Sequence, residues 1–228
     1  LPGALSVVAL SERGTMYFPG SIVYMNKIAV GPEAKGVIDV NAPVEENLKK
    51  VAKAKKRDVD DLTVVILDRP RHEKLISEVR ATGARIKLIP DGDIAGGLMT
   101  AIVDTGMDIL MGIGGSPEAV ITACALKCIG GEIQCKLWPR NEEERQKALD
   151  EGLDLERVLT IDDLVQGDNV FFAATGVTDG ELLQGVKYFG SGAKTYSIVM
   201  RSKSGTVRLV EATHKWEKLM RFSQIKFD

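Results

Sequence analysis

The sequence lacks the residues and patterns on which several common enzyme chemistries depend. Its 228 residues include two histidines, three cysteines and 5% aromatic residues. A Ser-His-Asp or Cys-His arrangement would have to use His72, because His214 lies in the charged C-terminal region, and the Arg/Pro setting of His72 does not suggest one. No G-x-x-x-x-G-K-[ST] loop occurs, and residues 112–115 (GIGG) lack the full spacing of a dinucleotide turn. The sequence therefore favours neither a nucleophilic triad nor a glycine loop for nucleotides.

Long hydrophobic runs and an excess of one charge are also missing. No apolar run approaches the length of a membrane span, and there is no secretion signal. With a formal net charge of −2, we expect neither nucleic acid nor a membrane as a partner. Cys124, Cys128 and Cys135 do not have the spacing of a zinc module, so we interpret them as buried, reduced thiols. These features predict a cytoplasmic protein.

The first residues form an unusual start for a natural protein. The chain has no initiator methionine and enters a strand-like apolar run at residues 4–10 almost at once. We therefore expect that the chain was cleaved or is one piece of something larger.

The stretch at residues 88–118 organises the rest of the sequence. It predicts a strand, an acidic turn at 90–93 (PDGD), a helix at 94–103 and a short buried strand at 107–111. A glycine turn at 112–115 follows, and then a helix with Ser116 as its N-cap. Because both turns follow strands at the same sheet edge, they are candidates for a ligand site.

The two turns and a pair of arginines suggest a phosphate chemistry. Free N–H groups at a helix start suit phosphate, and carboxylates beside phosphate usually imply a divalent cation. Arg69 and Arg71 either clamp phosphate or cap the sheet edge and pair with nearby acids. The simpler interpretation is that Asp-Gly-Asp is an ordinary turn composition. The combination favours metal-assisted hydrolysis of a phosphate ester.

The remaining periodicity predicts an α/β layered protein without an internal linker. Helices are expected at 44–56, 72–81, 119–129 and 142–151, and strands at 24–30, 62–67, 132–137, 158–161 and 169–174. Antiparallel pairs are expected at both ends, 4–10 with 15–18 and 195–201 with 206–212. Strands alternate with helices through the middle of the chain, which is the pattern of a layered fold. The basic run at 53–57 is interpreted as a solvated helix end.

Several short motifs occur in the order seen in class II fructose-1,6-bisphosphatases, and the chain resembles that family over essentially its whole length. The motifs are YMNK at 24–27, VGPEAKG at 30–36, RPRH at 69–72, IPDGD at 89–93, GIGGSPE at 112–118 and AATG at 173–176. Each motif is weak alone, whereas all of them in register make the resemblance specific.

The resemblance implies a layered αβαβα sandwich of the sugar phosphatase and inositol monophosphatase type. It implies hydrolysis of the 1-phosphate of fructose 1,6-bisphosphate, as in gluconeogenesis, with Mn²⁺ or Mg²⁺ as the cofactor. Carried over by residue, Glu118 would be a metal ligand. The sugar-phosphate site would be lined by Tyr24, Arg69, Pro70, Arg71, Asp91, Gly92, Asp93 and Gly115. In that case Asp91 and Asp93 accept sugar hydroxyls rather than bind metal.

One part of the family pattern is missing from this chain. The family has an N-terminal region of about a hundred residues, domain-sized, with the other metal-binding acids and the expected catalytic motif, Asp-Pro-x-Asp/Glu-Gly-Thr. Residues 1–228 would then be the C-terminal, substrate-binding portion, and the N-terminal part would be missing. Glu118 alone cannot hold a catalytic cation, because hard divalent ions need several oxygen ligands.

Alternative functions remain open at this point. The chain could bind phosphosugars without catalysis, as a fragment or subunit that needs a separate N-terminal segment. Sedoheptulose 1,7-bisphosphate could also be a substrate, and fold kinship alone suggests an inositol-phosphate phosphatase. We also expect a homo-oligomer, as is common among soluble enzymes.

Overall fold

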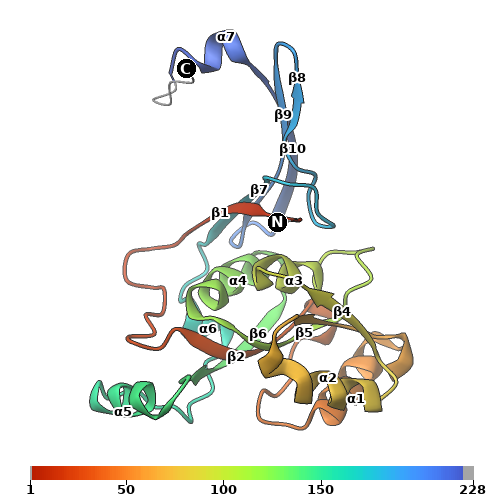
Figure 1. The fold of residues 1–228 in the computed structure, drawn as a ribbon, viewed down its shortest axis with the longest axis vertical. Helices are drawn as coiled ribbons and strands as arrows, with labels where there is room; N and C mark the ends of the chain where they lie inside the picture. Colours follow the sequence, from red (N-terminus) through yellow and green to blue (C-terminus); the bar gives the residue numbers. More distant parts are fainter. Residues whose placement is uncertain (1, 223–228) are drawn as a thin grey trace.

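Two β-sheets and the helices packed on them form the part of the chain that the structure, a computed structural model, describes, residues 2–222 (Figure 1). The first sheet has the order β4-β3-β5-β2-β6. Its strands are β2 (Tyr24–Val30), β3 (Thr63–Leu67), β4 (Arg85–Ile89), β5 (Ile109–Gly115) and β6 (Glu132–Trp138). β3 is parallel to β4 and β5, whereas β2 is antiparallel to β5 and β6. The carboxyl ends of β3, β4 and β5 therefore share one edge.

Helices cover both faces of this sheet. α1 (Val44–Lys55) and α2 (Glu73–Ala81) bury apolar stripes, including Leu48, against one face. α3 (Asp93–Met99) and α4 (Ser116–Ile129) lie on the other face. α4 is apolar nearly all round, as expected for a helix covered on both sides.

The second sheet lies against the opposite side of α3 and α4. Its order is β1-β7-β9-β10, with β8 paired to β9, and all its pairs are antiparallel. The strands are β1 (Leu5–Leu10), β7 (Phe171–Gly176), β8 (Lys187–Phe189), β9 (Gly192–Arg201) and β10 (Thr206–Lys215). Phe172, Ile198 and Met200 pack from this sheet onto Ala125 and Cys128 of α4. The described layers are thus helix, sheet, helix and sheet, which confirms the layered α/β prediction.

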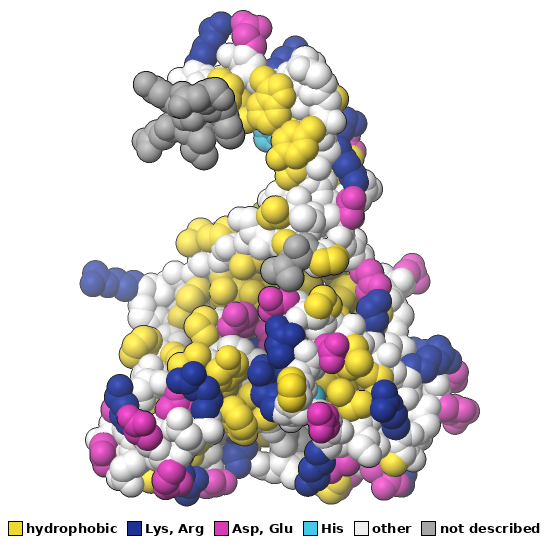
Figure 2. Space-filling view, in the orientation of Figure 1, with side chains coloured by type: hydrophobic (Ala, Val, Ile, Leu, Met, Phe, Trp, Pro, Cys, Tyr) yellow, Lys and Arg dark blue, Asp and Glu magenta, His cyan; other side chains and the backbone are white. Residues whose placement is uncertain are grey.

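The β9–β10 hairpin extends beyond the layers and ends in α7 (Trp216–Leu219) (Figure 1). Hydrophobic side chains gather near the outer end in the space-filling view (Figure 2), where β8 turns into β9 and β10 leads into α7. The rings of Tyr188 and Trp216 stack there with their centres 6.1 Å apart. On the outer face of the sheet, Val8 and Leu10 remain 52% and 60% exposed.

Most predicted elements are present, and three predictions were wrong. Residues 4–10 do not pair with 15–18, because β1 pairs with β7 far along the chain. Residues 158–161 form a single bridge, Leu159 to Cys135, instead of a strand. The predicted glycine turn is the last part of β5, because β2 pairs with it as far as Gly115. The surface helix α5 (Glu142–Asp150) is present as predicted, and a short helix, α6 (Ile161–Leu164), follows it.

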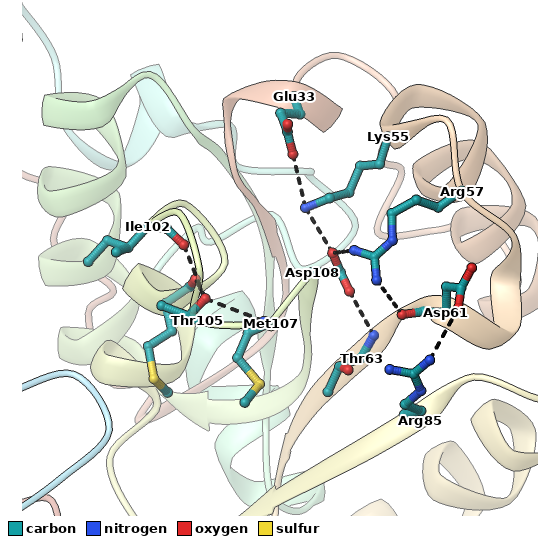
Figure 3. Close-up of polar contacts among 11 residues, drawn as sticks. Glu33, Lys55, Arg57, Asp61, Thr63, Arg85, Ile102, Thr105, Met107 and Asp108 are labelled. Atoms are coloured by element: carbon teal, nitrogen blue, oxygen red, sulfur yellow. Dashed lines mark hydrogen bonds and ion pairs between the residues drawn. The ribbon is translucent and has the colours of Figure 1, made fainter.

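Asp108 stabilises the edge of the first sheet at which β3 and β5 begin (Figure 3). This carboxylate is 2% exposed and accepts hydrogen bonds from the Thr63 N–H at 2.8 Å and from Arg57 at 2.9 Å. Lys55 forms an ion pair with it, also at 2.9 Å. The interpretation of the basic run as a merely solvated helix end was therefore wrong, since two of its cations neutralise a buried acid.

The structure also tests the prediction of buried, reduced cysteines and the search for a membrane span. Cys124, Cys128 and Cys135 are free and buried, as predicted. Burial raises the pKa of the Cys124 thiol to about 12. Within residues 2–222 no helix combines the length and apolarity that a membrane crossing requires.

Candidate functional site

The segments after β3 and β4 meet at the shared sheet edge, as the sequence predicts. Arg69 donates from Nη1 to the Pro90 carbonyl at 2.6 Å, and its Nη2 lies 3.4 Å from the Asp91 carboxylate. Pro70 opens a 3-10 turn, Pro70–His72, that leads into α2. Gly92 has a φ of +67° and donates its N–H to Asp91 at 3.0 Å. Arg69 thus pairs with an acid of the neighbouring turn, one of the two roles expected of it.

Arg71 links β2 to the end of β5. Its guanidinium lies 5.0 Å from the centre of the Tyr24 ring. Its Nε and Nη2 donate to the Ile113 carbonyl at 3.1 and 2.8 Å. The Tyr24 ring is held in turn by an edge contact with Trp138. Two of the predicted residues, from distant parts of the chain, are therefore in direct contact.

His72 is part of the same cluster, although no pattern in the sequence predicts that it belongs to the site. The Ile113 N–H donates to His72 Nε2 at 2.7 Å, so Nδ1 holds the ring proton. Nδ1 donates to the Leu67 carbonyl, also at 2.7 Å. Burial lowers the pKa of His72, and the neighbouring Arg71 and Arg69 lower it further. The ring is thus a neutral bridge between β3 and β5.

Asp93 does not project freely from the acidic turn. It is 4% exposed at the start of α3, and its Oδ2 lies 2.5 Å from Nζ of Lys27, which is 1% exposed. Among residues 2–222, Oδ1 of Asp93 has no hydrogen-bond partner. A lysine in the middle of the otherwise largely apolar strand β2 was the signal that could have revealed this pair.

Glycines at the end of β5 leave room for two of the acidic side chains. A Cβ on Gly114 would lie 2.0 Å from Oδ2 of Asp93. A Cβ on Gly115 would lie 1.8 Å from Oε2 of Glu118. Ser116 does not cap α4 as predicted, because its hydroxyl is buried and donates to the Ile22 carbonyl. The glycines of the GIGGSPE segment therefore allow two carboxylates to lie directly against the backbone.

The acids described at this edge do not form a complete cation site. Glu118 is half-buried in the first turn of α4, and the nearest buried acid to the glycines, Asp93, is already neutralised by Lys27. The one group of three acids within residues 2–222 whose ligand atoms lie within 4.8 Å of one another is Asp58, Asp60 and Asp61. That acidic cluster precedes β3, at the opposite end of the strand, and Asp61 pairs with Arg85. Residues 2–222 alone therefore do not fit a catalytic divalent metal.

Comparison with known proteins identifies the family of the chain. The family model described as "Bacterial fructose-1,6-bisphosphatase, glpX-encoded" matches residues 1–214. A D-fructose 1,6-bisphosphatase class 2/sedoheptulose 1,7-bisphosphatase of Synechococcus sp. (strain JA-2-3B'a(2-13)) is 43% identical over 93% of the chain and 65% of that protein. A fructose-1,6-bisphosphatase class 2 of Haemophilus influenzae is 39% identical over 97% of the chain and 70% of that protein. The chain thus spans about two thirds of the length of these relatives, and it belongs to the bacterial, glpX-encoded fructose-1,6-bisphosphatase family.

Proposed function

We propose that residues 1–228 are the phosphosugar-binding part of an enzyme that hydrolyses the 1-phosphate of fructose 1,6-bisphosphate. The observation that supports this most is the cluster of Arg69, Arg71, Asp91 and Tyr24 at the ends of strands β2, β3 and β4. Guanidinium groups match phosphate oxygens bidentately, and carboxylates accept hydrogen bonds from sugar hydroxyls. The family membership and the names of the relatives point to the same substrate class.

In this proposal, Arg69 and Arg71 fix a phosphate, and Asp91 and Asp93 orient the sugar. Pro70, Gly92 and Gly115 set the backbone around these side chains. Mn²⁺ or Mg²⁺, when bound, would supply an activated water and offset charge on the phosphoryl oxygens. Glu118 would be one ligand of that cation.

The other metal ligands and the catalytic motif would lie on polypeptide that corresponds to the part of the relatives outside the match. We infer that this N-terminal segment and a sugar bisphosphate are the partners of the chain, together with further copies of it. A role in gluconeogenesis, activity on sedoheptulose 1,7-bisphosphate and a cytoplasmic location belong to the same proposal. Neither nucleic acid nor a membrane is a partner in it.

A second function is favoured by the incomplete set of acids. If Glu118 is the only cation ligand available, the chain alone binds phosphosugar and does not hydrolyse it. Calorimetry and phosphate release with fructose 1,6-bisphosphate, with and without Mn²⁺, separate the two functions. We expect binding without metal, and phosphate release only from a longer protein that includes the N-terminal segment.

Two arginine variants test the site, one at the sheet edge where β3 ends and one at the edge where β3 and β4 begin. Arg69→Gln is expected to weaken binding by about tenfold, because it removes a charge-assisted contact. Arg85→Gln removes a surface ion pair with Asp61 at the opposite end and is the matched control, with unchanged binding.

In the longer protein, Glu118→Gln should abolish phosphate release. Turnover that is unchanged by Glu118→Gln would contradict its role as a ligand, and a chain that binds no phosphosugar would overturn the whole proposal.

A further inference from the structure

The last residues of β5 have no neighbouring strand on the side of β3. β3 pairs with β5 only through Val64 with Ile109 and Val65 with Leu110. β5 continues to Gly115 and keeps β2 on its other side. Ile113 directs its N–H and its carbonyl away from β2, toward the side where β3 has ended. These two polar groups would be left without partners if nothing replaced the missing strand.

Two consecutive side chains replace the strand. The imidazole of His72 accepts the Ile113 N–H, and the guanidinium of Arg71 donates to the Ile113 carbonyl. His72 is itself fixed by the carbonyl of Leu67, the last residue of β3. A continuous hydrogen-bond path therefore runs from the end of β3 through the imidazole to β5.

Gly112 is an independent sign that this packing is specific. Its φ is +131°, and a Cβ there would lie 2.9 Å from Nε2 of His72. Any other residue would push the imidazole away from Ile113 and strain the backbone. The position of the imidazole therefore requires a glycine at residue 112.

We infer that His72 is a positioning residue for the phosphosugar site, and this inference rests on the proposed function. By bonding Ile113, the imidazole fixes the backbone that continues into Gly114 and Gly115, against which Asp93 and Glu118 pack. It also fixes the carbonyl to which Arg71 donates. His72 acts through these groups and does not itself touch the substrate.

The bond itself is testable without any ligand. In the ¹⁵N-labelled chain, a scalar coupling across the N–H···N bond should connect the Ile113 amide nitrogen to Nε2 of His72. We expect this coupling, together with an Nδ1-protonated imidazole, at neutral pH. Absence of the coupling would overturn the inference even if the chain binds phosphosugar.

Two variants separate the two hydrogen bonds of the ring. The amide of His72→Gln places an acceptor near the position of Nε2, whereas His72→Asn places a donor near Nδ1 and has no group that reaches Ile113. Binding of fructose 1,6-bisphosphate should therefore weaken by about tenfold in His72→Asn and recover most of that loss in His72→Gln. His214→Gln, at the β9–β10 hairpin, is the control and should bind like the wild type.

The outcomes distinguish this inference from the proposed function. Equal affinities for wild type, Asn and Gln variants, each checked as folded by its amide spectrum, would overturn the positioning role alone. A wild type that shows the coupling but binds no sugar phosphate would overturn the proposed function, and the positioning role with it.

Discussion

At the scale of single residues, Asp108 combines deep burial with two cationic partners at its sheet edge. Its carboxylate binds Lys55, Arg57 and the Thr63 N–H. Removing one partner of a buried ion pair leaves the other charge uncompensated, and Lys55 is only 11% exposed. We expect Asp108→Ala to lower the free energy of unfolding by about 3 kcal/mol, measured in urea.

The control for Asp108 is the other acid near Lys55. Glu33 is 70% exposed, so Glu33→Ala should change stability by about 0.5 kcal/mol or less. Similar losses in the two variants would show that burial does not determine the strength of this network.

His72 should also make stability depend on pH. Its pKa is lowered in the folded state by burial and by Arg71, while the unfolded value is about 6.5. Below that pH the unfolded chain binds the proton more readily than the folded chain does. The contribution of His72 to the free energy of unfolding is therefore fully present above about pH 6.5 and decreases as the pH drops toward the folded pKa. Urea unfolding from pH 5 to pH 7 should show a steeper fall for the wild type than for His72→Gln. Parallel curves would contradict this expectation.

At the scale of elements, the end of β5 tolerates no side chain at Gly114. A Cβ there would overlap Oδ2 of Asp93 and lie 3.0 Å from Nζ of Lys27. Forcing the buried pair apart should cost about 2 kcal/mol in Gly114→Ala, measured by urea unfolding. Gly190→Ala, where no atom lies within 4 Å of the added carbon, should be within about 0.5 kcal/mol of the wild type. Equal stability of the two variants would show that the pair moves without cost.

Local patterns predicted the elements whose own residues carry the pattern, and they missed the pairings and contacts made with distant segments. The stripe of α1 and the residues of β2 were predicted from periodicity, because the pattern is contained in the element itself. Residues 112–115 were interpreted as a turn from their glycines, although β2 and the side chain of His72 hold them extended. No local pattern contains either partner.

The same distinction explains the candidate site. The rule that parallel strands end at one edge brought Arg69 and Asp91 together correctly. The roles of Lys27 and His72 depend on Asp93 and Ile113, which are tens of residues away. Their chemistry could be seen only after the strands were placed.

At the scale of the whole molecule, α4 packs against both sheets, so we expect the two sheets to unfold together. Leu126 packs into the core of the first sheet, and Ala125 and Cys128 pack into the core of the second. Fluorescence of Trp138, followed in a Trp216→Phe variant, and far-UV circular dichroism should therefore give the same urea midpoint. Leu126→Ala should shift both midpoints together, by about 3 kcal/mol in free energy. Separate midpoints would mean that each sheet folds by itself.

The outer side of β10 has a consequence for how the protein behaves in concentrated solution. β10 has ten residues and, within residues 2–222, pairs only with β9, so a row of backbone donors and acceptors is available along its other side. Such an edge is a template on which further strands can grow into aggregates. Arg208, Glu211 and Lys215 place alternating charges along it. We expect these three charges to oppose the pairing of further strands, and hence aggregation, at high concentration.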